Sequence, residues 1–141
     1  VDIIYDMSCK NDIFYQYHPP FVTRESILDD MGALPPGKGY DDKFYVGFFE
    51  YDSLVGLMDL ILDYPEKEIS FIGLFMTDTR YQNRGVGSGI ISDVILCLKS
   101  SGYKEIRLGV DKGNPQSYSF WTKNKFTPIR EDTYILMGLR I

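Results

Sequence analysis

The chain has 141 residues, of which 44% are hydrophobic and 25% are charged, which is the composition of one folded domain, 1–141, with a proper core. Its net charge of −5 argues against a nucleic-acid partner, because nucleic-acid-binding proteins usually present a basic face. The chain has no apolar stretch of bilayer-spanning length, and its two cysteines form no metal-spacing motif and no disulfide framework. We therefore expect a cytoplasmic protein with no membrane partner and no metal site.

The N-terminal part of the chain has the least regular pattern. Val1–Tyr5 is predicted as a strand, and Asn11–Tyr17 is ambiguous but favours a short helix. His18 is the only histidine, and because two prolines follow it we predict a loop residue without a catalytic role. Thr23 begins another short helix, with Ser26 where a full capping box would have an acidic residue.

Three strands are predicted after a loop that spans Gly32–Asp42. The runs Phe44–Tyr51 and Leu54–Asp63 are rich in aromatic and apolar residues, and only Asp52 and Ser53 separate them, which predicts a hairpin. A turn then leads into a third run, Glu68–Thr77. This order predicts three consecutive antiparallel strands.

A glycine-rich turn, Gln82–Gly89, joins the third strand to the helix-period run Ile90–Leu98. A strand, a glycine turn and a helix in this order point free backbone N–H groups and the positive end of a helix dipole at one place. That place is suited to a phosphate or pyrophosphate. The glycines let a phosphate approach the backbone, and Arg80 and Arg84 add positive charge.

Two other phosphate-binding motifs fit this turn less well. A dinucleotide-binding fingerprint needs Gly-x-Gly-x-x-Gly, but Gly85-Val86-Gly87 is followed by Ser88-Gly89-Ile90. A nucleotide triphosphatase loop needs Gly-Lys-Ser/Thr after its glycines, which this chain lacks.

The C-terminal part alternates helices and strands. A helix over 83–100 places six apolar residues on one face, and Cys97 is expected as a buried free thiol. The run Glu105–Asp111 alternates apolar and polar residues, as a strand does. Asn114 is a good N-cap for a helix to about Asn124, and closing strands are predicted over 126–130 and 134–141.

Two of these segments resemble the signatures of the GNAT superfamily of acyl-CoA-dependent N-acyltransferases. Gln82–Gly87 resembles the pyrophosphate signature Gln/Arg-x-x-Gly-x-Gly/Ala. The segment Asn114–Phe126 resembles a second signature, in which Ser117 replaces a small alanine and Asn124 stands where glycine is common and can itself adopt a left-handed conformation. Residues that match the second signature by position are Asn114, Phe120, Lys123 and Phe126.

The resemblance implies an α+β fold: a mixed, mostly antiparallel central sheet flanked by helices, with two parallel strands that splay apart to admit acetyl-CoA. Backbone groups of the third strand would pair with the pantetheine arm, and one N–H would polarise the thioester carbonyl. The cofactor-binding residues implied in this way are Leu74, Phe75, Met76, Gln82, Asn83, Arg84, Gly85, Val86, Gly87, Ser88, Gly89, Asn114, Trp121 and Lys123.

The activity implied is direct transfer of an acetyl group to a primary amine of a small molecule or peptide. A general base must deprotonate the amine, and Glu50, Asp59, Glu68 and Asp111 are acidic candidates. The acidic pairs Asp29-Asp30 and Asp41-Asp42 flank the presumed acceptor loop and could attract a cationic amine.

The chain departs from the family at the residue that commonly protonates the leaving thiolate. Trp121 occupies the place of a tyrosine, and an indole N–H can donate a hydrogen bond but cannot titrate usefully. Tyr118, one helical turn earlier, is predicted to take over the acid role. The departure leaves a non-enzymatic acyl-CoA-binding module as the alternative function, and a homodimer stays open.

Overall fold

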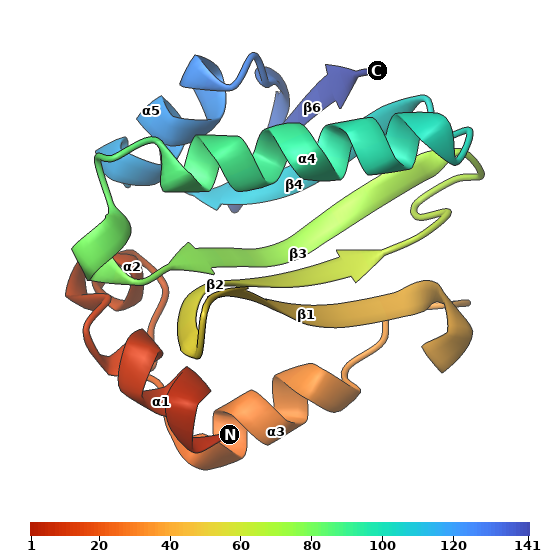
Figure 1. Cartoon of the computed structure of the whole chain (residues 1–141). Helices are drawn as coiled ribbons and strands as arrows, with labels where there is room; N and C mark the ends of the chain where they lie inside the picture. Colours follow the sequence, from red (N-terminus) through yellow and green to blue (C-terminus); the bar gives the residue numbers. More distant parts are fainter.

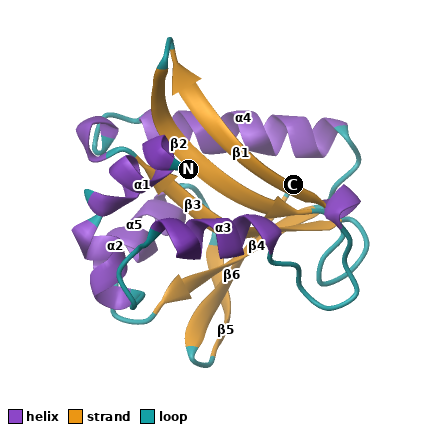
Figure 2. Ribbon diagram, turned by 90° about the horizontal axis from the view of Figure 1, so that it is seen from below, coloured by secondary structure: helices purple, strands orange, loops and turns teal.

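Six strands form one twisted sheet in the computed structural model, which describes all residues from 1 to 141 (Figures 1 and 2). The fold is α+β, as predicted. The helices are α1 (Asp2–Cys9), α2 (Asp12–Tyr17), α3 (Arg24–Gly32), α4 (Val86–Ser100) and α5 (Pro115–Lys123), with short 3₁₀ turns at Tyr40–Asp42 and Thr79–Tyr81. The strands are β1 (Lys43–Glu50), β2 (Ser53–Ile61), β3 (Ile69–Thr77), β4 (Glu105–Asp111), β5 (Thr127–Glu131) and β6 (Tyr134–Arg140).

The sheet runs in the order β1-β2-β3-β4-β6-β5, and only the pair β3–β4 is parallel. That pair is short, because it extends only from Ile69 opposite Glu105 to Ile72 opposite Leu108. Beyond these residues β3 and β4 are no longer paired with each other. This confirms the predicted pair of splayed parallel strands.

Helices cover both faces of the sheet. On one face, α4 and α5 pack over a cluster that includes Met58, Ile91, Leu108 and Trp121 (Figure 1). On the other face, Met7 of α1 packs against residues of β2 and β3. The predicted apolar face of α4 is confirmed, because none of its members is exposed: Val86, Ile90, Ile91, Val94, Ile95 and Leu98.

The prediction of a first strand over Val1–Tyr5 is wrong, because these residues begin the helix α1. Ile4 and Met7 are three residues apart and therefore share a helix face, and both pack against the apolar cluster on β2 and β3. The sheet thus has one strand fewer than predicted. The ambiguous segment after α1 is the helix α2, as favoured.

Two smaller predictions are also corrected. Cys97 is exposed rather than buried, because it lies about 100° around the helix from the buried Leu98. Helix α4 begins at Val86 rather than Asn83, since Asn83 (φ 62°) and Gly85 (φ 78°) are both left-handed and cannot extend a right-handed helix. At Thr23, the Ser26 hydroxyl accepts from the Thr23 N–H at 2.9 Å, so a serine completes the capping box without an acid.

Candidate active site

The separation of β3 from β4 opens the site. The last paired residues are Ile72 and Leu108, so Leu74, Phe75 and Met76 continue β3 with no strand on the β4 side. On the opposite side β3 remains paired with β2. The free edge of β3 therefore has backbone groups available for a ligand that enters between the strands, as the predicted pantetheine contact requires.

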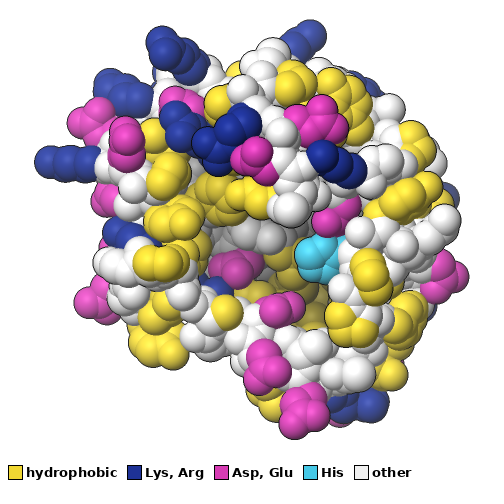
Figure 3. Space-filling model, turned by 180° about the vertical axis from the view of Figure 1, so that it is seen from behind, with side chains coloured by type: hydrophobic (Ala, Val, Ile, Leu, Met, Phe, Trp, Pro, Cys, Tyr) yellow, Lys and Arg dark blue, Asp and Glu magenta, His cyan; other side chains and the backbone are white.

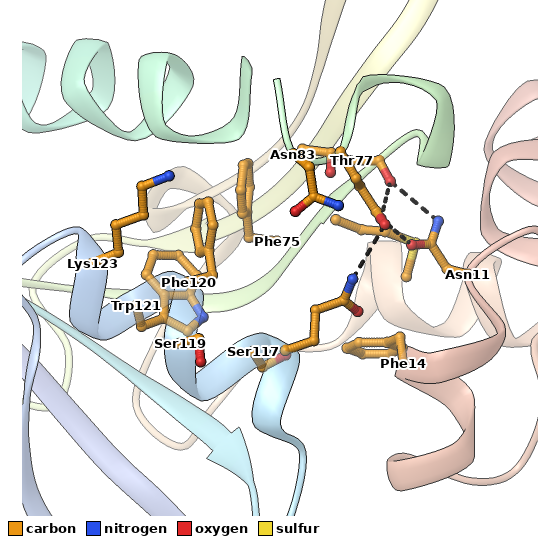
Figure 4. Close-up of a pocket in the computed structure, with 13 residues that line it drawn as sticks. Asn11, Phe14, Phe75, Thr77, Asn83, Ser117, Ser119, Phe120, Trp121 and Lys123 are labelled. Atoms are coloured by element: carbon orange, nitrogen blue, oxygen red, sulfur yellow. Dashed lines mark hydrogen bonds between the residues drawn. The ribbon is translucent and has the colours of Figure 1, made fainter. Parts of the chain in front are cut away.

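A cavity of about 320 Å³ lies along this free edge, between the end of β3, α2 and α5. Figure 4 shows Phe75, Phe120 and Trp121 on one side of it and Asn11 on the other. Several residues predicted to bind the cofactor line this cavity, namely Phe75, Met76, Gln82, Asn83, Trp121 and Lys123. Residues of both sequence motifs thus line this cavity, whereas Arg84, the glycines of the turn and Asn114 do not.

The glycine turn leaves the N-terminus of α4 without a cap. Gly85 takes the N-cap position in a left-handed conformation, and no side chain caps the helix. Gly89 donates to the Gly85 carbonyl at 2.9 Å, which is the first bond of the helix. The N–H groups of Val86, Gly87 and Ser88 consequently have no helical acceptor, and this donor set fits a pyrophosphate.

One of the two arginines near the turn, Arg80, differs from the prediction. Arg80 is held by Asp78, whose carboxylate accepts from the Arg80 guanidinium at 3.1 and 3.2 Å, so its charge is already paired. Although burial opposes the charged form of Asp78, hydrogen bonds from Arg80 hold its pKa below the usual range. Lys123, which lines the cavity, and Arg84, which follows the lining residue Asn83, form no ion pair within the chain and are free to meet an anion.

Gln82 has a structural role that its motif does not reveal. Its amide donates to the Asn11 side chain at 2.9 Å and to the Thr77 carbonyl at 3.3 Å. Asn11 also donates to the Thr77 carbonyl, at 3.2 Å, and Figure 4 shows these bonds joining Asn11 to the end of β3. The side chain of Gln82 therefore fixes the N-terminal helices against the start of the glycine turn.

The structure gives a steric reason for glycine at position 87 but none at position 89. A Cβ on Gly87 would lie 3.0 Å from the Phe120 ring, whereas a Cβ on Gly89 would meet nothing within 4 Å. At Gly87 the close packing of α5 on α4 thus leaves little room for a side chain. The same two helices are also joined by a hydrogen bond from the Asn124 amide, at the end of α5, to the Ser88 hydroxyl at 3.1 Å. The left-handed residue after α5 is Lys125 (φ 75°), not Asn124.

Helix α5 presents different side chains to the cavity and to solvent. Asn114 is buried and caps the helix, accepting from the Ser117 N–H at 3.2 Å, so the capping half of its prediction is confirmed. Trp121 is 7% exposed and packs edge-on against Phe75, Phe120 and Phe126. Tyr118 is 37% exposed and lines neither this cavity nor a second, larger one on the other face of the sheet.

A larger cavity of about 850 Å³ lies on the sheet face opposite α4. Figure 3 shows this face hollowed, with acidic side chains in and around the hollow and the histidine at its edge. Its lining comes from α2, α3, α5, the strands β2 to β6 and the loops that connect them. Four residues line both cavities, namely Phe14, Phe75, Ser117 and Trp121. The two cavities therefore meet at the gap between β3 and β4.

Two of the four acidic candidates for the general base, Asp59 and Asp111, line the larger cavity, whereas Glu50 and Glu68 line neither cavity. The Asp59 carboxylate accepts from the Lys43 ammonium at 2.9 and 3.0 Å, and Lys43 is only 4% exposed. Its negative charge is therefore already compensated.

Asp30 lines the larger cavity as well and has no side-chain partner among the hydrogen bonds and ion pairs. Burial raises the pKa of its carboxyl, and the nearby Asp59 carboxylate raises it further. Of the two acidic pairs predicted to attract an amine, only Asp30 of the first pair lines the cavity, whereas Asp42 of the second pair is bound by Lys38 at 3.2 Å.

His18 also lines the larger cavity, although its sequence context favoured a plain loop residue. Its Nδ1 lies 3.0 and 3.1 Å from the two carboxylate oxygens of Asp111. The two residues are 93 positions apart, so no local pattern could have linked them. No group of three or more His, Cys, Asp or Glu side chains is arranged to hold a metal ion. None of the helices combines the length and apolar character needed to cross a membrane.

The fold has several solved counterparts. An acetyltransferase from Thermus thermophilus has a TM-score of 0.85 with 19% identity, covering 99% of this chain and 90% of that one. The PaiA N-acetyltransferase from Thermoplasma acidophilum in complex with coenzyme A has a TM-score of 0.73 with 16% identity, covering 99% and 92%. The ribosomal-protein-S18-alanine N-acetyltransferase from Escherichia coli has a TM-score of 0.69 with 14% identity, covering 99% and 88%.

Among curated proteins, no sequence matches this chain. The model of the acetyltransferase (GNAT) family matches residues 8–126, which include both signature segments, the splayed strands and most of both cavity linings. The chain therefore belongs to the GNAT acetyltransferase family.

Proposed function

We propose that the protein transfers the acetyl group of acetyl-CoA to a primary amine by direct attack in a ternary complex. The observation that carries this proposal is that two cavities meet at the gap between β3 and β4 and share Phe14, Phe75, Ser117 and Trp121. One cavity is lined by Gln82 and Asn83, just before the uncapped end of α4, and the other opens on the opposite face of the sheet. Such an arrangement brings two substrates together from opposite sides.

The smaller cavity suits acetyl-CoA, the standard cofactor of the family. The N–H groups at the start of α4, together with Arg84, would hold the pyrophosphate. The free edge of Leu74–Met76 would pair with the pantetheine amides. When bound, acetyl-CoA supplies an activated thioester, and an N–H from this edge of β3 would polarise its carbonyl.

The larger cavity suits a cationic amine. Asp30 contributes a carboxylate without a partner, whereas the charge of Asp59 is compensated by Lys43. An alkyl amine is protonated at neutral pH, because its pKa is about 10.4, and an unpaired carboxylate attracts it. Two of the similar structures are named as N-acetyltransferases, which supports an amine acceptor.

An acetylation assay with detection of free thiol tests the proposal. The protein, acetyl-CoA and a panel of primary amines and peptide N-termini should give amine-dependent release of coenzyme A, and mass spectrometry should find the N-acetyl product. Calorimetry with coenzyme A measures binding separately. Binding without turnover across the panel would favour the alternative, an acyl-CoA-binding module, which the indole of Trp121 motivates.

The acid role of Tyr118 stays a prediction, and Tyr118→Phe tests it by removing only the hydroxyl. If Tyr118 protonates the leaving thiolate, kcat falls at least about tenfold while affinity for acetyl-CoA is unchanged. Tyr51→Phe is the matched control, because Tyr51 is 96% exposed at the β1–β2 turn and belongs to neither cavity lining. Wild-type kcat in Tyr118→Phe would remove this residue from the mechanism.

A further inference from the structure

We infer that His18, oriented by Asp111, is the general base that deprotonates the acceptor amine. This inference rests on the proposed function, because it assigns a residue to that reaction. It starts from the pairing of His18 Nδ1 with the Asp111 carboxylate at 3.0 and 3.1 Å, in the lining of the larger cavity.

The imidazole is held from two sides. Asp111 binds its Nδ1, and the Phe14 ring lies against it with ring centroids 5.2 Å apart. An ionised carboxylate can only accept hydrogen bonds, so Nδ1 carries the proton of the neutral ring and Nε2 keeps its lone pair. The His18 side chain is 59% exposed and lines the larger cavity, so a substrate or a bridging water can reach the ring.

The sheet register places the His18–Asp111 pair level with the segment of β3 where the thioester is proposed to bind. Ile72 and Leu108 are the last paired residues of β3 and β4. Phe75 and Asp111 each lie three residues further along their strands, on the two sides of the gap. Since strands rise about 3.3 Å per residue, Asp111 stands at the same level as the part of β3 that would hold the thioester. Phe14, which packs on His18, lines both cavities.

The reaction balances with His18 as base. Nε2 takes one proton from the ammonium group, and the freed nitrogen lone pair forms a C–N bond at the thioester carbonyl. The C–S bond then breaks and the sulfur leaves with its electron pair. The nitrogen loses a second proton as it becomes an amide, and the thiolate gains one proton to become a thiol. The proton on His18 returns to solvent through its exposed edge. The net products are the amide, free coenzyme A and one proton.

Other charged groups line this cavity, so mutations must show which group causes the pH dependence of the reaction. Asp30 lies close enough to His18 that the imidazole acts to lower the pKa of the Asp30 carboxyl, against the larger effect of burial, which raises it. Of the other charged groups in the lining, Asp59 is paired with Lys43, Arg107 with Glu105 and Arg130 with Asp132. The remaining titratable groups of the lining are Tyr15, Tyr64 and Tyr134. Asp111 is therefore the carboxylate that holds His18, and Asp30 is the neighbouring charge to vary as a second test.

Nitrogen-15 NMR tests the orientation of the imidazole directly. His18 is the only histidine in the chain, so its ring signals need no assignment. We expect the neutral ring of the wild type to carry its proton on Nδ1 and Asp111→Asn to lose this preference. Asp2→Asn is the matched control, since it removes a carboxylate from the exposed pair with Arg24 and should leave the imidazole signals unchanged. A wild-type ring protonated on Nε2 would overturn the inference.

Kinetics test the base itself. With 2-phenylethylamine, which is protonated at pH 7, His18→Gln should lower kcat/KM at least about a hundredfold and Asp111→Asn at least about tenfold. With aniline, which is uncharged at neutral pH, the loss should be about threefold or less, because no ammonium must be deprotonated. The deficit with 2-phenylethylamine should also shrink towards pH 10, where the free amine becomes abundant. Affinity for acetyl-CoA should not change in either variant.

The outcomes separate this inference from the proposed function. A His18→Gln variant with wild-type kcat/KM for 2-phenylethylamine, or with equal losses for both amines, would overturn the base role and leave the acetyltransferase intact. Asp30→Asn is expected to raise KM for 2-phenylethylamine without removing the contrast between the two amines. Absence of acetyl transfer from the wild type to every amine of the panel would instead overturn the proposed function, and the base role with it.

Discussion

Replacing Gly87 by Asp is expected to weaken acetyl-CoA binding at least about tenfold, or about 1.4 kcal/mol. Gly87 lies in the first turn of α4, where the free N–H groups point towards the place proposed for the pyrophosphate. A carboxylate there adds like-charge repulsion and opposes the favourable field of the helix end. The side chain also meets Phe120, because even a Cβ would lie 3.0 Å from that ring. Isothermal calorimetry with coenzyme A measures the effect.

The charge and the bulk at this position can be separated. Gly87→Asn has nearly the same shape as Gly87→Asp but no charge, so the difference between their affinities isolates electrostatic repulsion. Gly89→Ala adds a methyl group that meets nothing within 4 Å, and we expect it to bind coenzyme A nearly as the wild type does. Equal affinity of a folded Gly87→Asp variant and the wild type would exclude the proposed pyrophosphate site.

Lys43→Met is expected to lower the free energy of unfolding by about 3 kcal/mol. The Lys43 ammonium is 4% exposed and the Asp59 carboxylate 16% exposed, and they are joined by bonds of 2.9 and 3.0 Å. Removing the cation leaves Asp59 largely buried without compensation and next to the Asp30 carboxylate. We expect the lower end of the range for buried pairs, because Asp59 borders a cavity that water can enter. Urea denaturation followed by circular dichroism measures the loss.

A double variant shows whether the loss comes from the unpaired charge. Lys43→Met with Asp59→Leu removes both charges, and we expect it to recover most of the stability, because the cost arises from an isolated buried carboxylate. Arg24→Met is the control, since its partner Asp2 is exposed and the melting temperature should hardly change. A single Lys43→Met variant as stable as the wild type would show that Asp59 is not desolvated.

The sequence by itself determined most of the sheet and the glycine turn that is proposed to bind the pyrophosphate. Alternating side chains predicted β4 as Glu105–Asp111, because one face of that strand is buried and the other is not. Asn114 followed by Pro115 marked the start of α5, because capping uses neighbouring residues. The glycine turn could be predicted for the same reason, because a helix N-terminus with free amides is built from consecutive residues.

Local patterns failed where a partner distant in sequence decided the outcome. Val1–Tyr5 has the apolar residues of a strand, but docking of Met7 onto β2 and β3 stabilises a helix. Gln82 matches a cofactor motif, yet its side chain binds Asn11, 71 residues earlier. Phe120 crowds Gly87 only because α5 packs on α4.

Only the tertiary structure decided the half of the site that is proposed to bind the acceptor. His18 follows a short helix and Asp111 ends a strand, and neither position carries a signal that links it to the other 93 residues away. Their contact depends on where α2 docks beside the gap between β3 and β4, and the width of that gap depends on a register that ends at Ile72 and Leu108. A binding turn for phosphate is built from consecutive backbone amides, so the sequence encodes it directly. A proton-transfer pair is built from side chains on different elements, so it exists only once the sheet has fixed their distance.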